Sequence, residues 1–482
     1  LLARYARLNH DKQIFRGNLD YLVHARKVYD ERVRCDGGRV PLERSAGTIT
    51  HDRDALRGSC ADQLAHLLDR HRLRHQCREF ARMVTLALRI GDARGFSGDQ
   101  PVAQEIRKHV AQMGHAANIS GLRIKVNWYY TGITMNAARH PTSTLMFAEA
   151  SEAAQIVAKQ LSDNAILAKE LAKLILRPAT HTIFTCARGS SDHAAAYGKF
   201  LFETRLRKTV SSHPPSMGSV YRVPMEHMAG QPFIVVSQSG KSPDLLASAE
   251  VAREAGAIVI AMVNDESAPL APLADIVIPL RAGPERSVAA TKSFIATLSA
   301  FAQIISECVG GQALDPVIAA LPDQLCQSWA ASWDEALAPF SQARSLFVLG
   351  RGPSFGIALE AALKFKETCG IHAEAFSTAE VAHGPMAVID RNFPILVFPP
   401  LDEARAGMDA LLRLFLEKEA IVAGAGPVGH GAIELPVVAG LHPVTAPITM
   451  IQSCYRFANA LAIERGLDPD RPPLLKKVTE TI

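Results

Sequence analysis

The chain has 482 residues, a net charge of +4, 48% hydrophobic residues and 21% charged residues. These values are typical of a globular protein of two to four domains with more than one hydrophobic core. No run reaches the roughly 18 uninterrupted apolar residues of a membrane span, and no secretory segment opens the chain. We therefore expect a cytoplasmic protein that has no membrane partner.

None of the eight cysteines forms a C-x-x-C pair with another. Such spacing indicates neither a zinc site nor a disulfide framework. Scattered cysteines of this kind fit reduced thiols in the cytosol. We expect neither a metal nor a cofactor.

Residues 1–134 differ in composition from the rest of the chain. They hold 23 Lys and Arg against 14 Asp and Glu, a local charge of +9, whereas the remainder carries −5. No helix-turn-helix, zinc finger or aromatic RNA-binding signature accompanies this charge. The segment can be read as a nucleic-acid-binding arm, as a disordered extension, or as upstream sequence read in frame ahead of Met135. We favour the third interpretation and predict no nucleic-acid partner.

From Met146 onward, short apolar runs alternate with amphipathic stretches. This pattern predicts an α/β fold of two tandem subdomains, 146–325 and 326–482, each a parallel sheet flanked by helices in a flavodoxin-like sandwich. We expect helices at 193–205, 245–255 and 357–368. We expect strands at 182–186, 233–236, 258–263 and 276–280 in the first subdomain, and at 346–349, 395–398 and 420–423 in the second.

A weak internal repeat supports two similar subdomains. Residues 184–190 (Phe-Thr-Cys-Ala-Arg-Gly-Ser) resemble residues 347–353 (Phe-Val-Leu-Gly-Arg-Gly-Pro), each a strand that runs into a glycine turn and then a helix. Only the first copy keeps small hydroxyl residues after its strands. Because open parallel sheets bind ligands beyond the carboxyl ends of their strands, we expect the ligand at the first copy's loops.

The loop Ser237-Gln238-Ser239-Gly240-Lys241-Ser242 lies between an expected strand and an expected helix. Hydroxyls, an amide and backbone N–H groups at a helix N-terminus can hold an anion, and glycine allows close approach. The alternative is an ordinary helix cap, since Ser is a good N-cap. A second hydroxyl-rich turn, Gly189-Ser190-Ser191, favours a bound phosphate ester. The absence of a Walker pattern argues against a nucleoside triphosphate.

Glu360, Lys364 and Glu367 fall at i, i+4 and i+7 of the expected helix 357–368, and so on one face. One interpretation is a surface ladder of ion pairs. The other is a partly buried carboxylate beside a lysine, which can act as an acid or base. From composition alone, His383 is best read as structural and Lys477 as part of a solvated tail.

The region from Met146 to Ile482, about 70% of the chain, resembles the SIS-domain sugar isomerase family. It is similar to the isomerase half of glucosamine-6-phosphate synthase, which is built from two SIS subdomains. The motifs that carry this resemblance are Gly189-Ser190-Ser191, Ser237-Gln238-Ser239-Gly240, Val288-Ala289-Ala290-Thr291-Lys292, the helix from Ile357 through Glu367, Ile371-His372-Ala373-Glu374-Ala375, His383-Gly384-Pro385, and the tail after Asp468-Pro469-Asp470-Arg471-Pro472.

The resemblance implies roles for the matched positions. Glu367 would move a proton between C1 and C2, Lys364 would lie beside the sugar hydroxyls, and Lys477 would form an imine at C2. His383 would open the sugar ring, reaching across from the partner subunit of a homodimer. The residues implied to bind substrate are Ser190, Ser191, Ser237, Gln238, Ser239, Ser242, Val288 and Glu360.

The sequence also departs from the synthase pattern. Lys241 stands where the synthase loop usually has Glu, and Ser242 where it has Thr. Residues 1–134 show nothing like the glutaminase domain, so no internal source of ammonia is expected. The ending is similar to the stand-alone SIS-type glucosamine-6-phosphate deaminases. We therefore expect an isomerising deaminase that converts glucosamine 6-phosphate and water to fructose 6-phosphate and ammonia.

Three alternatives stay open at this point. The chain can act as a synthase-type aminotransferase on fructose 6-phosphate. It can deaminate another phosphorylated amino sugar, such as galactosamine or fructosamine 6-phosphate. It can also be a non-catalytic sugar-phosphate sensor, although a sensor needs neither Glu367, His383 nor Lys477.

Overall fold

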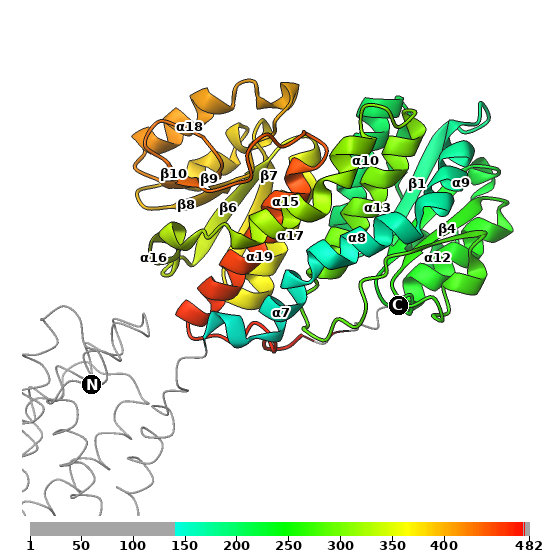
Figure 1. Cartoon of the computed structure of the whole chain (residues 1–482), viewed down its shortest axis with the longest axis horizontal. Helices are drawn as coiled ribbons and strands as arrows, with labels where there is room; N and C mark the ends of the chain where they lie inside the picture. The colour runs from blue at the N-terminus through cyan, green and yellow to red at the C-terminus, as the bar shows by residue number, and fades with distance from the viewer. Residues whose placement is uncertain (1–139, 476, 478–482) are drawn as a thin grey trace, which may run out of the picture. The chain divides into compact units, whose positions relative to one another are not determined.

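The computed structural model describes residues 140–475 and residue 477 (Figure 1). The segment 1–134, with its predicted basic extension, lies outside the described residues. The predicted boundary between the two subdomains, after residue 325, falls inside α15 (Leu321–Ala330). The division at this residue therefore stays a prediction.

Five parallel strands form the first sheet, in the order β2-β1-β3-β4-β5. Every member except β2 was expected from the sequence, within two residues at each end. The strands are β1 (Thr182–Ala187), β2 (Thr209–Ser212), β3 (Pro232–Ser237), β4 (Ile258–Val263) and β5 (Ile276–Pro279).

The second sheet repeats this topology. Its order is β10-β9-β8-β6-β7, which places the strands, counted within the subdomain, in the same 2-1-3-4-5 arrangement. The α/β fold with two tandem parallel sheets is therefore confirmed. The strands are β6 (Ser345–Gly350), β7 (His372–Ser377), β8 (Pro394–Val397), β9 (Ile421–Ala425) and β10 (Ile433–Leu435).

Helices cover both faces of each sheet, and several lie between the two sheets (Figure 1). The α-helices of the first half are α7 (Leu145–Ser151), α8 (Ala153–Asp163), α9 (Ala165–Leu176), α10 (Ser190–Leu206), α11 (Pro215–Ser219), α12 (Pro243–Glu254), α13 (Lys292–Cys308) and α14 (Asp315–Ala319). Those of the second half, after α15, are α16 (Leu337–Phe340), α17 (Pro353–Cys369), α18 (Met408–Glu417) and α19 (Ala446–Glu464).

The central strands are buried on both faces. Along β3, Ile234 and Val236 face a large core shared by both halves, whereas Phe233 and Val235 face a smaller core under α12. A third core lies under α18 on the outer face of the second sheet. The shared core includes residues of α8, α10, α13, α15, α17 and α19, so the two halves pack as one body.

The helices α10 and α17 meet at close range between the two halves. A Cβ atom on Gly356 would lie 2.8 Å from the His193 carbonyl oxygen and 2.9 Å from the Tyr197 backbone nitrogen. Both atoms belong to the backbone, which cannot move aside as a side chain can. The glycine therefore allows the start of α10 to lie against the face of α17 that carries Glu360, one turn further on.

Candidate active site

The expected phosphate loop, residues 237–242, runs from the last residue of β3 to the residue before α12. Ser237 Oγ accepts a hydrogen bond from the Gly240 N–H at 3.1 Å, and Ser239 Oγ accepts one from the Lys241 N–H at 3.3 Å. Gly240 has φ +61°, and a Cβ there would lie 2.6 Å from the Ala268 Cβ. The loop is therefore a tight turn in which glycine is required.

Ser242 is the residue immediately before α12, at the N-cap position, but its hydroxyl makes no capping hydrogen bond. The helix-cap interpretation of this serine thus lacks the bond that defines it. Gln238, Ser239 and Ser242 are each half-buried, so their polar atoms can meet a ligand at the carboxyl edge of the sheet.

The second hydroxyl-rich turn lies next to this loop. It follows β1, which pairs directly with β3 in the sheet. Arg188 Nε also contacts the buried Asp244 Oδ2 at 2.7 Å, which ties the turn to the first turn of α12. Ser190 and Ser191 begin α10 here, both half-buried. The structure therefore brings the two predicted turns together at one edge of the first sheet.

Glu360, Lys364 and Glu367 do not form a solvated ladder. The side chains of Glu360 and Lys364 have no exposed surface, and that of Glu367 is 19% exposed. Lys364 Nζ lies 2.5 Å from Glu367 Oε2 and 3.4 Å from Glu360 Oε1. It also donates to Ser190 Oγ at 3.4 Å. The charged residues of α17 therefore contact the turn Gly189-Ser190-Ser191 at the start of α10, called the serine turn below.

The charge on Lys364 follows from this arrangement. Burial alone lowers the pKa of Lys364, but the Glu360 and Glu367 carboxylates on either side raise it above its usual range. The lysine is therefore a fixed ammonium, 2.5 Å from the carboxylate of Glu367.

Glu360 joins four side chains in the interior. Its carboxylate accepts hydrogen bonds from Ser190 Oγ at 3.1 Å and Tyr455 Oη at 3.2 Å, and contacts His193 Nδ1 at 3.1 Å, besides Lys364. Burial and the Glu360 charge raise the pKa of Tyr455 well above its usual range, so the phenol keeps its proton and donates it. His193 and Tyr455 were not predicted, because neither stands in a recognisable pattern.

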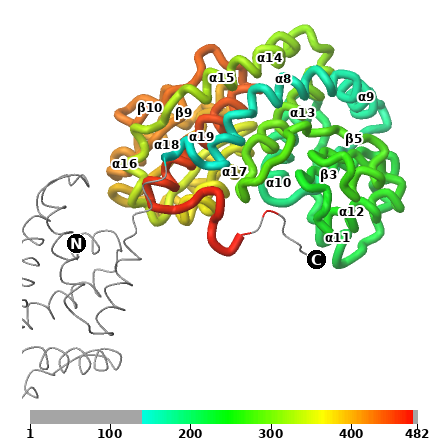
Figure 2. The backbone as a smooth tube through the Cα atoms, turned by 60° about the horizontal axis from the view of Figure 1, so that its bottom comes forward, coloured from blue at the N-terminus to red at the C-terminus, as the bar shows by residue number. Residues whose placement is uncertain are grey.

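Lys477 lies on the segment that follows α19 and runs along the molecule from the second half toward the first (Figure 2). Its Nζ lies 3.2 Å from Glu285 Oε2, on the loop between β5 and α13. The Glu285 carboxylate helps to raise the pKa of Lys364, so this ion pair lies within electrostatic range of the charged residues of α17. Lys477 is thus directed into the molecule and is not part of a solvated tail. Glu285 was missed by sequence reasoning.

Two predicted residues stand apart from this cluster. Val288 is half-buried on the same loop as Glu285, close in the chain to its polar network. His383 is exposed at the end of the short helix η6 (Glu380–Ala382). Within residues 140–475 and 477, no polar contact joins His383 to the cluster formed by Ser190, Glu360, Lys364, Glu367, Glu285 and Lys477.

A cavity of about 720 Å³ lies elsewhere, at the carboxyl edge of the second sheet. No predicted site residue lines it. Its polar side chains include Arg351, Asp402 and Glu403, but it contains neither a lysine nor a histidine. The buried acids and lysines converge elsewhere, between the start of α10 and the face of α17 that carries Lys364.

The described part of the chain holds no group of three or more His, Cys, Asp or Glu side chains placed to bind a metal. Among the same residues, no helix is both long and apolar enough to cross a membrane.

Comparison with known proteins agrees with this architecture. The SIS domain model matches residues 175–307 and 339–424. The solved structure of a candidate phosphosugar isomerase from Silicibacter pomeroyi DSS-3 is 36% identical, covers 68% of this chain and all of its own, and has a TM-score of 0.65. The chain belongs to the SIS-domain family.

The chain is also similar to two proteins named as aminotransferases. The C-terminal domain of glucosamine-fructose-6-phosphate aminotransferase from Francisella tularensis is 26% identical over 68% of this chain and 98% of its own, with a TM-score of 0.60. The isomerising glutamine–fructose-6-phosphate aminotransferase of Thermococcus kodakarensis is 33% identical over 61% of this chain and 51% of its own. The chain thus spans about half the length of the curated relatives it matches.

Proposed function

We propose that the protein is an isomerising deaminase that converts glucosamine 6-phosphate and water to fructose 6-phosphate and ammonia. The observation that carries this proposal is the Lys364–Glu367 pair, a 2.5 Å acid–base contact that also reaches Ser190 of the serine turn. Aldose–ketose interconversion needs such a base near a bound, open-chain sugar phosphate. The imine-forming lysine, Lys477, enters the same cluster.

The reaction follows from these groups. In the open-chain amino aldehyde, Glu367 removes the proton on C2 and returns it to C1, while the C1 oxygen gains a proton and the C2 amine loses one, which leaves a C1 hydroxyl and an imine at C2. The Lys364 ammonium stabilises the negative charge that develops on the sugar oxygen during this transfer. Lys477 adds to the C2 imine and displaces ammonia, and water then releases fructose 6-phosphate.

The hydroxyl-rich turns hold the phosphate in this proposal. Ser191, Ser237, Gln238, Ser239 and Ser242 supply hydroxyls, an amide and helix N-terminal N–H groups, with Ser190 contributing its backbone. Val288 lines the sugar, and Glu360 holds the end of the site nearest Ser190.

The homodimer and the role of His383 are part of the proposal. The exposed side chain of His383 is free to enter the site of a second copy, where it opens the sugar ring as a general acid. We also propose a cytosolic location, which fits the free cysteines of the described region.

Synthase-type aminotransferase activity is the second candidate, because its curated relatives carry that name. It uses the same isomerisation in the opposite direction, with fructose 6-phosphate and a nitrogen donor as substrates. The two candidates therefore share Glu367, Lys364 and Lys477 and differ in the source and fate of ammonia.

A substrate panel separates the candidates. The purified chain is incubated with glucosamine 6-phosphate, galactosamine 6-phosphate or fructosamine 6-phosphate, and separately with fructose 6-phosphate plus glutamine. We expect ammonia from glucosamine 6-phosphate and no amino sugar from glutamine. Glutamine-dependent synthesis would favour the aminotransferase, ammonia from another amino sugar would change the substrate, and binding without turnover would indicate a sensor.

A further inference from the structure

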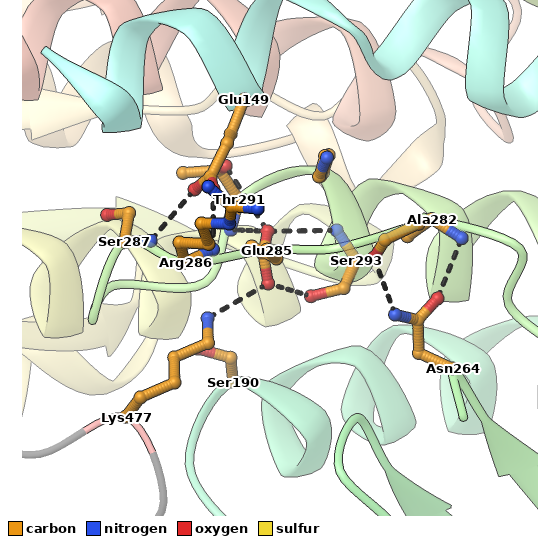
Figure 3. A network of polar contacts seen from close by, with 12 residues as sticks. Glu149, Ser190, Asn264, Ala282, Glu285, Arg286, Ser287, Thr291, Ser293 and Lys477 are labelled. Atoms are coloured by element: carbon orange, nitrogen blue, oxygen red, sulfur yellow. Dashed lines mark hydrogen bonds and ion pairs between the residues drawn. The ribbon is translucent and has the colours of Figure 1, made fainter. Parts of the chain in front are cut away.

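Glu285 is a buried carboxylate that accepts hydrogen bonds at both of its oxygens. Its side chain has no exposed surface. One oxygen accepts hydrogen bonds from the backbone N–H groups of Thr291 at 2.9 Å and Ser293 at 3.3 Å. The other accepts from Ser293 Oγ at 2.6 Å and from Lys477 Nζ at 3.2 Å (Figure 3).

These donors keep Glu285 ionised. Burial raises the pKa of the carboxyl, but the Lys477 ammonium and the hydrogen bonds from Ser293 and Thr291 bring it below its usual range. Breaking such a pair leaves an uncompensated buried charge, so Glu285 needs a cation at this position.

The loop that carries Glu285 is fixed independently of Lys477. Glu149 of α7 accepts hydrogen bonds from the backbone N–H groups of Arg286 at 2.5 Å and Ser287 at 3.1 Å (Figure 3). Thr291 and Ser293 hold the carboxylate from the start of α13. Glu285 is therefore the fixed partner of the pair, and it determines where the Lys477 nitrogen lies.

We propose that Glu285 is the positioning residue for Lys477, holding its nitrogen at the site and serving as the counterion of the imine that it forms. This inference rests on the proposed function and names a residue for its imine step. Glu285 also lies close enough to Lys364 and Tyr455 to act electrostatically on both, which places it at the same cluster as Glu367.

The proton balance supports this role. The lysine begins as an ammonium, so one proton must leave before its lone pair can add to C2, and Glu285 is the base in contact with it. That proton passes to the substrate nitrogen during addition. The Nζ–C2 bond forms, the bond from C2 to the substrate nitrogen breaks, and ammonia leaves. Glu285 thus begins and ends ionised, first beside the ammonium and then beside the protonated imine.

Reductive trapping tests the inference. The full chain is mixed with fructose 6-phosphate and sodium borohydride, and the adduct on Lys477 is measured by peptide mass spectrometry. We expect Glu285→Gln to slow trapping by about 100-fold, the scale of a positioned acid–base group, with little change in sugar-phosphate binding. Glu285→Asp, which keeps the charge, should recover part of the rate.

The matched control is Glu419→Gln, the same change in the exposed Arg391–Glu419 pair, which should trap at the wild-type rate. Wild-type trapping in Glu285→Gln, or equal rates in the Gln and Asp variants, would overturn the inference. If Glu285→Gln fails to fold, the Asp variant against wild type carries the test.

The inference and the proposed function fail differently. Trapping at Lys477 by a protein that releases no ammonia from glucosamine 6-phosphate would refute the deaminase but leave the role of Glu285 standing. A wild-type protein with no adduct on Lys477 would overturn the imine step and the inference together.

Discussion

At the residue scale, Lys364 lies between two carboxylates of unequal exposure. Glu360 is fully buried and already bound by Ser190, Tyr455 and His193, whereas Glu367 is partly exposed. Only Glu367 therefore combines contact with the ammonium and access to a substrate, which is the basis for assigning it as the base.

Replacing Glu367 with Gln should reduce turnover by about 10²- to 10⁴-fold, the usual contribution of a general base, because the amide cannot accept the C2 proton. Sugar-phosphate binding, measured by calorimetry, should change little. The exposed Glu374, changed to Gln, is the control and should leave turnover intact. A Glu367→Gln enzyme with wild-type turnover would show that the base is another residue.

His213 gives a pH dependence of stability. Burial and the neighbouring His227 lower the pKa of His213, whose ring packs edge-on against Phe233 at 5.6 Å. In the unfolded chain His213 takes up a proton near pH 6.5, whereas in the folded protein it is protonated only at a lower pH. Wild-type stability should fall relative to His213→Gln as the pH drops from about 6.5, then level off below the lowered pKa. Urea unfolding at several pH values measures this, and a constant difference would contradict it.

Residue-level prediction from sequence succeeded where neighbours in space are neighbours in the chain. Glu360, Lys364 and Glu367 share one helix face, so their spacing alone placed them together. Glu285 and Lys477 are 192 residues apart, and neither stands in a periodic pattern. Their contact depends on the whole fold and leaves no local signal.

At the element scale, the site depends on how closely α10 and α17 approach. Gly356→Ala should destabilise the protein by about 1–3 kcal/mol, because its Cβ meets backbone atoms and forces the helices apart. Turnover should also fall at temperatures where the variant is still fully folded, because Ser190 moves away from Glu360 and Lys364. Thermal unfolding and turnover measure the two effects.

Gly198→Ala is the control for this change. It lies on α10 as well, but its Cβ would meet the Phe301 ring, on α13, instead of the backbone of α17. Gly198→Ala should lower the stability of the protein, but the folded variant should keep its turnover. Wild-type activity in Gly356→Ala would contradict the importance of this helix contact.

The strands that sequence reasoning missed share a physical cause. β2, β7 and β10 lie at or near sheet edges, and β2 and β10 span only four and three residues. β7 is only partly buried and includes His372 and Glu374. Such strands lack the continuous apolar run that marks the central ones. The buried strands β3 and β4 were predicted because each has such a continuous apolar run.

At the scale of the whole molecule, the shared core fixes the geometry between the two halves. The serine turn comes from the first half, and Glu367 comes from a helix of the second. The internal repeat indicated two copies of one topology, and the sheet orders agree with it. How the copies pack against each other has no signature in a single sequence.

The proposed exchange of His383 between subunits predicts complementation. Glu367→Gln and His383→Asn should each be nearly inactive alone. Unfolded together and refolded as a mixture, half the dimers should be mixed, each with one intact site, so activity should return to about a quarter of wild type. Refolded wild-type protein is the control. A mixture no more active than its components would refute the shared site.

The central claim is tested most directly by product stoichiometry. The protein is incubated with glucosamine 6-phosphate, and ammonia and fructose 6-phosphate are measured in the same samples over time. We predict that both appear at equal rates with the wild-type protein and that neither appears with Glu367→Gln. Failure of the wild type to release either product, or equal release by the variant, would contradict the account.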